Sequence, residues 1–208
     1  MSKVINGFSV TRILQALSYI QRNAPSGNPD RFCVVYLLKI IFFSDRYHLR
    51  NFGITATSDN YVAMKLGPVA SSTLDVLNGN PFNFDCDDAK YLSSIEEIDK
   101  NNVKIKQQKE DELSESFKEA IDFALKEFGD FDWVKISNAS HCYPEWKKHE
   151  KKLSNLTKSV QMNEIDFFEN PNDSFFAEFG KKYDPFKEED EEFLALRKEH
   201  YHAYHASR

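Results

Sequence analysis

A long apolar run in the first quarter of the chain limits the possible folds more than any other feature. Residues 33–43 contain a single charged side chain, Lys39, and charged residues follow directly. The run is too short and too charged to span a bilayer. A helix that is apolar on nearly every face is normally surrounded by other elements, so residues 31–52 are predicted to form a buried central helix that ends at Gly53. Because the run is rich in β-branched and aromatic residues, a buried strand stays open as the alternative.

Further helices are predicted wherever apolar residues recur at helical spacing. These segments are residues 9–23, 69–78, 112–128, 132–139, 143–153, 163–169, 173–179 and 188–204. Three alternating segments, residues 60–65, 90–95 and 102–106, are predicted to pair as strands. The fold class is therefore predicted to be α+β and mainly α-helical, a multi-helix domain around a buried central helix with a small antiparallel sheet of two to three strands.

Charge and cysteine content exclude several classes of protein. The formal net charge of −6 without a basic block disfavours general nucleic-acid binding and binding to an anionic membrane. The three cysteines form no C-x-x-C pair, which indicates reduced thiols and a cytoplasmic location. No segment near residue 1 has the pattern of a signal peptide. No metal site and no cofactor are predicted, because His141 beside Cys142 lacks further ligands at a suitable spacing.

Two polar segments are the candidates for chemistry or binding. On a helix Asp45 and His48 are three residues apart, so His48 could act as a general base oriented by Asp45 in an uncharacterised hydrolase. Neither a nucleophile elbow nor a phosphate-binding loop accompanies them, so a structural or binding role is favoured. In the second segment, Gly67-Pro68 forces a sharp change of direction before the hydroxyl of Ser71, which is typical of a strand–turn–helix junction and could also present main-chain groups to a partner.

Residues 37–72, LLKIIFFSDRYHLRNFGITATSDNYVAMKLGPVASS, resemble the Panacea domain family, which includes the SocA-like antitoxins and phage-associated relatives. Residues 136–146, ISNASHCYPEW, are similar to a second motif of that family. One departure is Ala70, where the family often has proline. The matching residues of the first motif are Leu38, Lys39, Asp45, Arg46, His48, Leu49, Gly53, Tyr61, Ala63, Met64, Gly67, Pro68, Val69 and Ser71, and those of the second are Ser140, His141, Pro144 and Trp146.

The resemblance implies an antitoxin that is not an enzyme and that neutralises a cognate toxin protein by direct binding. The alternative within the family is a proteolytic adaptor that delivers the toxin to a host protease. Residues 1–170 are predicted to form the antitoxin domain, and residues 171–208 an acidic helical extension packed on it or projecting from it. Whether the chain forms a homodimer stays open. The residues predicted to bind the partner are Asp45, Arg46, His48, Arg50, Tyr61, Lys65, Gly67, Pro68 and Ser71, with Arg46, Arg50, Tyr61, Lys65 and Ser71 expected at the surface.

Overall fold

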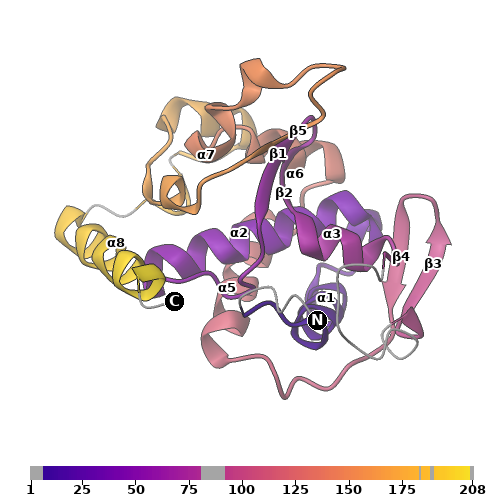
Figure 1. The fold of residues 1–208 in the computed structure, drawn as a ribbon. Coiled ribbons are helices and arrows are strands. Elements are labelled where there is room, and N and C mark those ends of the chain that lie inside the picture. Colours follow the sequence, from indigo (N-terminus) through magenta and orange to yellow (C-terminus); the bar gives the residue numbers. More distant parts are fainter. Residues whose placement is uncertain (1–6, 81–91, 183, 188–189, 207–208) are drawn as a thin grey trace.

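The computed structural model describes residues 7–80, 92–182, 184–187 and 190–206, and one helix runs through its centre (Figure 1). This helix, α2, spans Val34–Phe52 and is buried along most of its length. It ends where Gly53 adopts a left-handed conformation, with φ of 78°, as a glycine readily does. The predicted central helix is confirmed, and the alternative of a buried strand is wrong. The helix begins later than predicted because a short 3-10 helix, Pro29–Phe32, comes first.

Other helices surround α2 and confirm the mainly helical prediction. Three of them begin at a side chain that accepts a hydrogen bond from the first turn, namely Ser9, Ser114 and Asp132. The α-helices are α1 Val10–Asn23, α3 Ser71–Leu77, α5 Glu115–Phe128, α6 Trp133–Ser140, α7 Pro144–Lys147 and α8 Glu191–Ala206. Further 3-10 helices span Glu150–Lys152, Glu164–Phe168 and Asp173–Phe179.

The strands form two separate antiparallel sheets rather than the single sheet that the sequence predicted (Figure 1). In the first sheet, β1 (Tyr61–Met64) lies between β2 (Gly67–Ala70) and β5 (Ser159–Gln161). In the second, β3 (Ile95–Asp99) pairs with β4 (Asn102–Ile105). The predicted helix at residues 69–78 was wrong at its start, because Val69 and Ala70 pair with β1 as part of β2. Part of the predicted strand at 90–95 lies outside the described residues.

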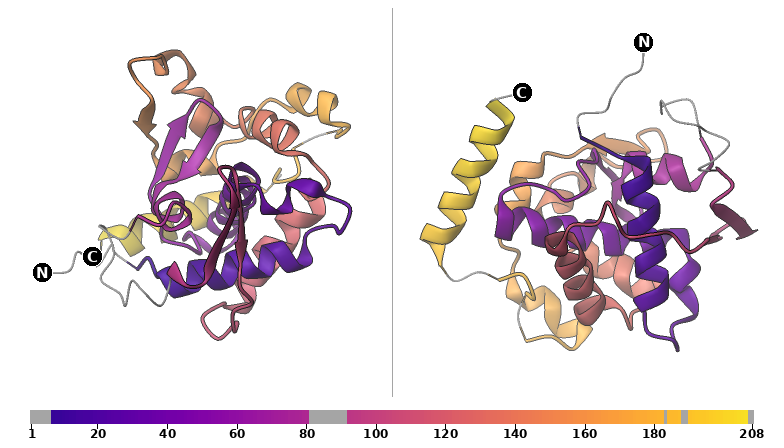
Figure 2. Two further views of the ribbon diagram at one scale, coloured as in Figure 1. Left: turned by 90° about the vertical axis from the view of Figure 1, so that its right-hand side faces the viewer. Right: turned by 90° about the horizontal axis from the view of Figure 1, so that it is seen from below.

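A cluster of phenylalanine rings packs around α2 within the core. Phe43 stacks on Phe128 of α5, with ring centroids 3.9 Å apart. Phe176 and Phe186, which follow the predicted boundary at residue 170, are also buried in this core. Helix α8 lies on the outside and packs against α2 (Figure 2). In the described part of the chain, no helix combines the length and the apolar character that a membrane crossing requires.

Candidate binding groove

Asp45 links α2 by hydrogen bonds to the segment that leads into the first sheet. Its Oδ1 accepts hydrogen bonds from the backbone N–H groups of Ala56, at 2.8 Å, and Thr57, at 3.0 Å. Its Oδ2 accepts from the hydroxyl of Thr57 and, at 2.7 Å, from the hydroxyl of Tyr61. Burial raises the pKa of Asp45, and the hydrogen bonds from Thr57 and Tyr61 oppose that rise. The carboxyl group is fully buried, so its hydrogen bonds are internal to the fold.

A second buried carboxylate, that of Asp59, caps the helix that follows the hairpin. It accepts hydrogen bonds from the backbone N–H groups of Ser72, at 2.8 Å, and Thr73, at 2.7 Å. These are N–H groups of the first turn of α3, which no side chain at the preceding position caps. The Ser71 hydroxyl donates to the carbonyl of Asn60 at 2.9 Å. Ser71 therefore links the start of α3 to the residue before β1, while its side chain stays partly exposed.

Arg46 and Arg50 form their polar contacts with other residues of this protein. Arg46 Nη1 lies 2.5 Å from Glu145 Oε1, and both side chains are fully buried. Arg46 also donates to the carbonyl of Glu169 at 2.7 Å, and Arg50 donates to the side-chain oxygen of Asn170 at 2.6 Å. The two arginines thus connect α2 to a segment about 120 residues later.

The prediction that Arg46, Arg50 and Tyr61 lie at the surface was wrong, because all three are buried. A charged side chain is buried only where it is paired, and the sequence did not reveal the distant partners of the two arginines. Tyr61 is covered because the ring of Phe167 packs against it, with centroids 5.2 Å apart.

His48 is likewise held by contacts within the fold. Its Nδ1 lies 2.7 Å from the carbonyl of Ile54, and its Nε2 lies 3.0 Å from Ser116 Oγ. Both ring nitrogens therefore have partners other than Asp45, although the two residues are three apart on α2. Burial lowers the pKa of His48. Within the described residues no three His, Cys, Asp or Glu side chains are grouped as ligands for a metal ion.

The start of β2, directly after the hairpin turn, requires glycine at position 67. Gly67 has φ of +102°, and a Cβ atom there would lie 2.3 Å from Ser140 Oγ and 2.9 Å from Lys39 Cε. A side chain would therefore be strained by both the backbone and the lack of space. The next residue, Pro68, is also buried, so both predicted binding residues of this pair are packed inside.

The second motif supports this hairpin from behind. The hydroxyl of Ser137 donates to the carbonyl of Leu66 at 2.8 Å. The indole N–H of Trp146 donates to the carbonyl of Met64 at 2.9 Å. The ring of His141 stacks on that of Trp146, with centroids 3.8 Å apart. The two motifs, far apart in the sequence, therefore form one structural unit.

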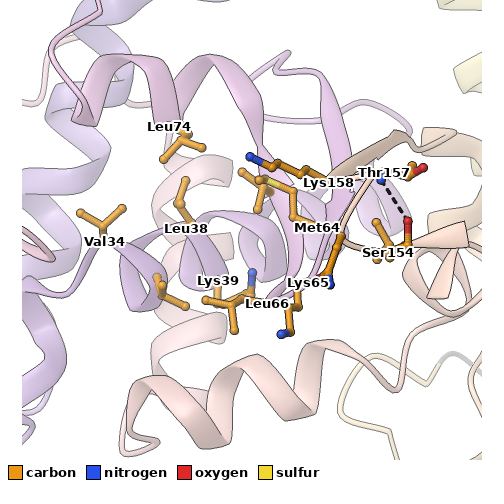
Figure 3. Close-up of a pocket in the computed structure, with 14 residues that line it drawn as sticks. Val34, Leu38, Lys39, Met64, Lys65, Leu66, Leu74, Ser154, Thr157 and Lys158 are labelled. Atoms are coloured by element: carbon orange, nitrogen blue, oxygen red, sulfur yellow. Dashed lines mark hydrogen bonds between the residues drawn. The ribbon is translucent and has the colours of Figure 1, made fainter. Parts of the chain in front are cut away.

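This unit opens onto an apolar groove of about 800 Å³ (Figure 3). Leu38 and Lys39 of α2 lie on one side of it, and Met64 and Leu66 of the hairpin on another. Lys65 is the only predicted binding residue that lines it. The lining residues are Val34, Val35, Leu38, Lys39, Met64, Lys65, Leu66, Val69, Leu74, Leu153, Ser154, Asn155, Thr157 and Lys158.

Sequence reasoning missed most of the groove. The alternation of residues 60–65 predicted a strand, and a strand places Val62 and Met64 on one face. That pattern could have identified Met64 as a partly exposed apolar residue. Residues 153–158 carry no comparable signal, because they reach the groove only through the pairing of β5 with β1.

Lys39 lies at the base of the groove with an exposed fraction of 1%. Its Nζ donates to the carbonyl of Pro68 at 2.7 Å. Burial lowers the pKa of Lys39 from 10.5 to about 7. The folded protein therefore holds an amine that is only partly protonated at neutral pH, next to an apolar surface.

Replacing Lys39 by Met is expected to stabilise the protein by about 2 kcal/mol at pH 6, after subtraction of the lost hydrogen bond. Between pH 7 and 10.5 the unfolded chain keeps a proton on Lys39 that the folded chain has released, so the stability of the native protein rises with pH in this window. The advantage of Lys39→Met should therefore disappear by pH 10. Urea unfolding at several pH values measures this difference, with the exposed Lys65→Met as the control. A difference that does not change with pH would contradict the prediction.

Comparison with known families agrees with the two motifs. No curated protein and no solved structure matches the chain significantly. Residues 37–147, just over half of the chain, match the family described as antitoxin SocA-like, Panacea domain. The match includes most of α2, the hairpin that borders the groove and the supporting second motif. The chain therefore belongs to the SocA-like antitoxin family with the Panacea domain.

Proposed function

We propose that this protein is an antitoxin that neutralises a partner toxin by direct binding in the apolar groove, with no catalytic step of its own. The observation that supports this proposal is the groove itself. It is open, mainly apolar and lined in part by residues of the first family motif, whose hairpin the second motif supports. Apolar depressions of this size with a few polar groups are typical of binding sites.

The contacts of the motif residues support a binding function over hydrolysis. Asp45 and His48 were the alternative catalytic pair, yet their polar atoms are used by Thr57, Tyr61, Ile54 and Ser116. A general base must reach a substrate proton with a free acceptor atom. Such internal bonding instead suits residues that hold the hairpin and α2 in place beside the groove.

The proposal is tested by co-expression with the product of the adjacent reading frame. We expect that product to be toxic alone and the wild-type protein to restore growth. Met64→Asp and Leu66→Asp place a charge in the groove and should weaken binding by about 30-fold or more, because buried apolar contacts dominate interface energies. The matched control is Leu196→Asp, at a leucine of α8 that is 59% exposed.

Toxin abundance separates direct neutralisation from delivery to a protease. Direct binding predicts that the amount of toxin is unchanged when growth is restored. A protease-dependent fall in toxin would favour the adaptor alternative. A neighbour that is harmless, or that stays toxic beside the wild-type protein, would contradict the proposal altogether.

A further inference from the structure

The charge of the groove is opposite to that of the whole protein. Three lysines line it, namely Lys39, Lys65 and Lys158, and no acidic residue is among the described residues that do. The chain as a whole has a net charge of −6. Lys65 and Lys158 are exposed and form no ion pair within the part of the chain that the structure describes. Two free positive charges therefore stand beside an apolar surface.

Apolar side chains from three elements form the rest of the groove. Val34 and Leu38 are four residues apart on α2 and so lie on one face of that helix. Met64 from β1 and Leu74 from α3 lie on the other sides. At the rim, Leu66 has an exposed fraction of 43%. A partner that covers this surface must itself be apolar on one side.

Leu156 extends the exposed apolar surface beyond the groove. It lies in the loop of residues 153–158, several of which line the groove, and its exposed fraction is 97%. An apolar side chain so fully exposed gains from burial against a partner. The loop therefore adds a contact at the edge of the same surface.

Several main-chain groups beside the groove are already hydrogen-bonded within the chain. In β2, Pro68 has no N–H, and its carbonyl accepts from Lys39. In the loop, the N–H of Ser154 donates to the carbonyl of Thr157. The N–H groups of Leu156 and Thr157 donate to Ser154 Oγ (Figure 3 shows the second of these bonds). Although β2 and β5 are the outer strands of the first sheet, the main-chain groups named above are already paired, so a partner segment that satisfies its own backbone groups, as a helix does, fits this surface.

We propose that the groove binds an amphipathic helix of the partner toxin whose apolar face is flanked by aspartate or glutamate residues. This inference rests on the proposed function and names the chemistry of the partner at that site. The apolar face of the helix covers Leu38, Met64 and Leu74, and its carboxylates pair with Lys65 and Lys158. Opposite charges at the rim speed the encounter and select for acidic partners.

The test measures the affinity of purified antitoxin for the purified product of the adjacent reading frame. We expect Lys65→Glu/Lys158→Glu to weaken binding about 50-fold, because charge reversal replaces attraction by repulsion. The control, Lys126→Glu/Lys198→Glu, changes the net charge equally at exposed lysines that do not line the groove, and should change the affinity less than threefold. Thermal unfolding of all variants checks that each is folded.

Zero-length carbodiimide cross-linking of the wild-type complex identifies the contact directly. It joins a lysine amine to a carboxylate in contact with it. We expect Lys65 and Lys158 to cross-link to acidic residues three, four or seven positions apart in one toxin segment, the spacing of a helix face.

The possible outcomes separate the two proposals. If the toxin is neutralised but the charge-reversed variant binds as tightly as the control, the groove does not bind an acidic helix and the antitoxin function stands. Cross-links that map to a basic or extended toxin segment would overturn the inference in the same way. If the wild-type protein neither binds nor neutralises the neighbouring product, the antitoxin proposal fails, and with it the inference.

Discussion

Replacing Glu145 by Gln should lower the free energy of unfolding by about 3 kcal/mol, because it leaves the buried charge of Arg46 without its counter-charge. Both side chains are fully buried, and the guanidinium lies over the ring of Tyr143, 4.4 Å from the ring centroid. Burial raises the pKa of Glu145, and Arg46 opposes that rise. The prediction is measured by urea unfolding at neutral pH.

The double variant Arg46→Met/Glu145→Leu separates the cost of an unpaired charge from the net value of the pair. Removing both charges should recover much of the loss, since a buried ion pair is often no more stable than apolar residues of similar size. An exposed ion-paired lysine, Lys148, provides the control, because Lys148→Met should cost less than about 1 kcal/mol. If Glu145→Gln lowers the free energy of unfolding no more than Lys148→Met does, the charge of Glu145 is not needed to stabilise the buried charge of Arg46.

Replacing Asp45 by Asn is expected to destabilise the protein by about 3 kcal/mol. The carboxylate accepts hydrogen bonds from two backbone N–H groups and from the hydroxyls of Thr57 and Tyr61. An asparagine offers one acceptor oxygen, and its NH₂ group would face donors. Unfolding measurements should show this loss, and amide hydrogen exchange should quicken at Ala56 and Thr57 in particular.

Tyr61→Phe is the matched comparison for Asp45→Asn, because it removes only one of the four hydrogen bonds. It should cost about 1 kcal/mol and leave the exchange of the Ala56 amide unchanged. Equal effects of Asp45→Asn and Tyr61→Phe would show that the backbone contacts of Asp45 contribute nothing.

These stability effects alter how motif variants should be judged in a neutralisation assay. Loss of neutralisation in Asp45, Arg46 or Glu145 variants would follow from unfolding as readily as from a lost contact. Lys65, Met64 and Leu66 are the informative positions, because they line the groove and are at least partly exposed. Binding should therefore be compared only among variants shown to be folded at the assay temperature.

The sequence alone determined the central helix and most of the helices around it. An apolar run of this length can be covered only from several sides, and Gly53 ends the helix by adopting a backbone angle that other residues rarely take. The caps at Ser9, Ser114 and Asp132 are local too, since each bonds a residue three positions later. Contacts between residues so close in the sequence can be predicted from the residue types alone.

The tertiary structure alone decided which polar residues are buried and where the groove lies. Arg46 and Arg50 look like surface residues until partners about 100 to 120 positions later are brought to them. Val34 and Lys158, far apart in the sequence, line the same groove because β5, a strand of three residues, pairs with β1. A strand so short has too little alternation to be recognised, and its free energy comes from pairing and packing rather than from local propensity. For this reason the family could be identified from the motif, whereas the binding surface could be located only from the fold.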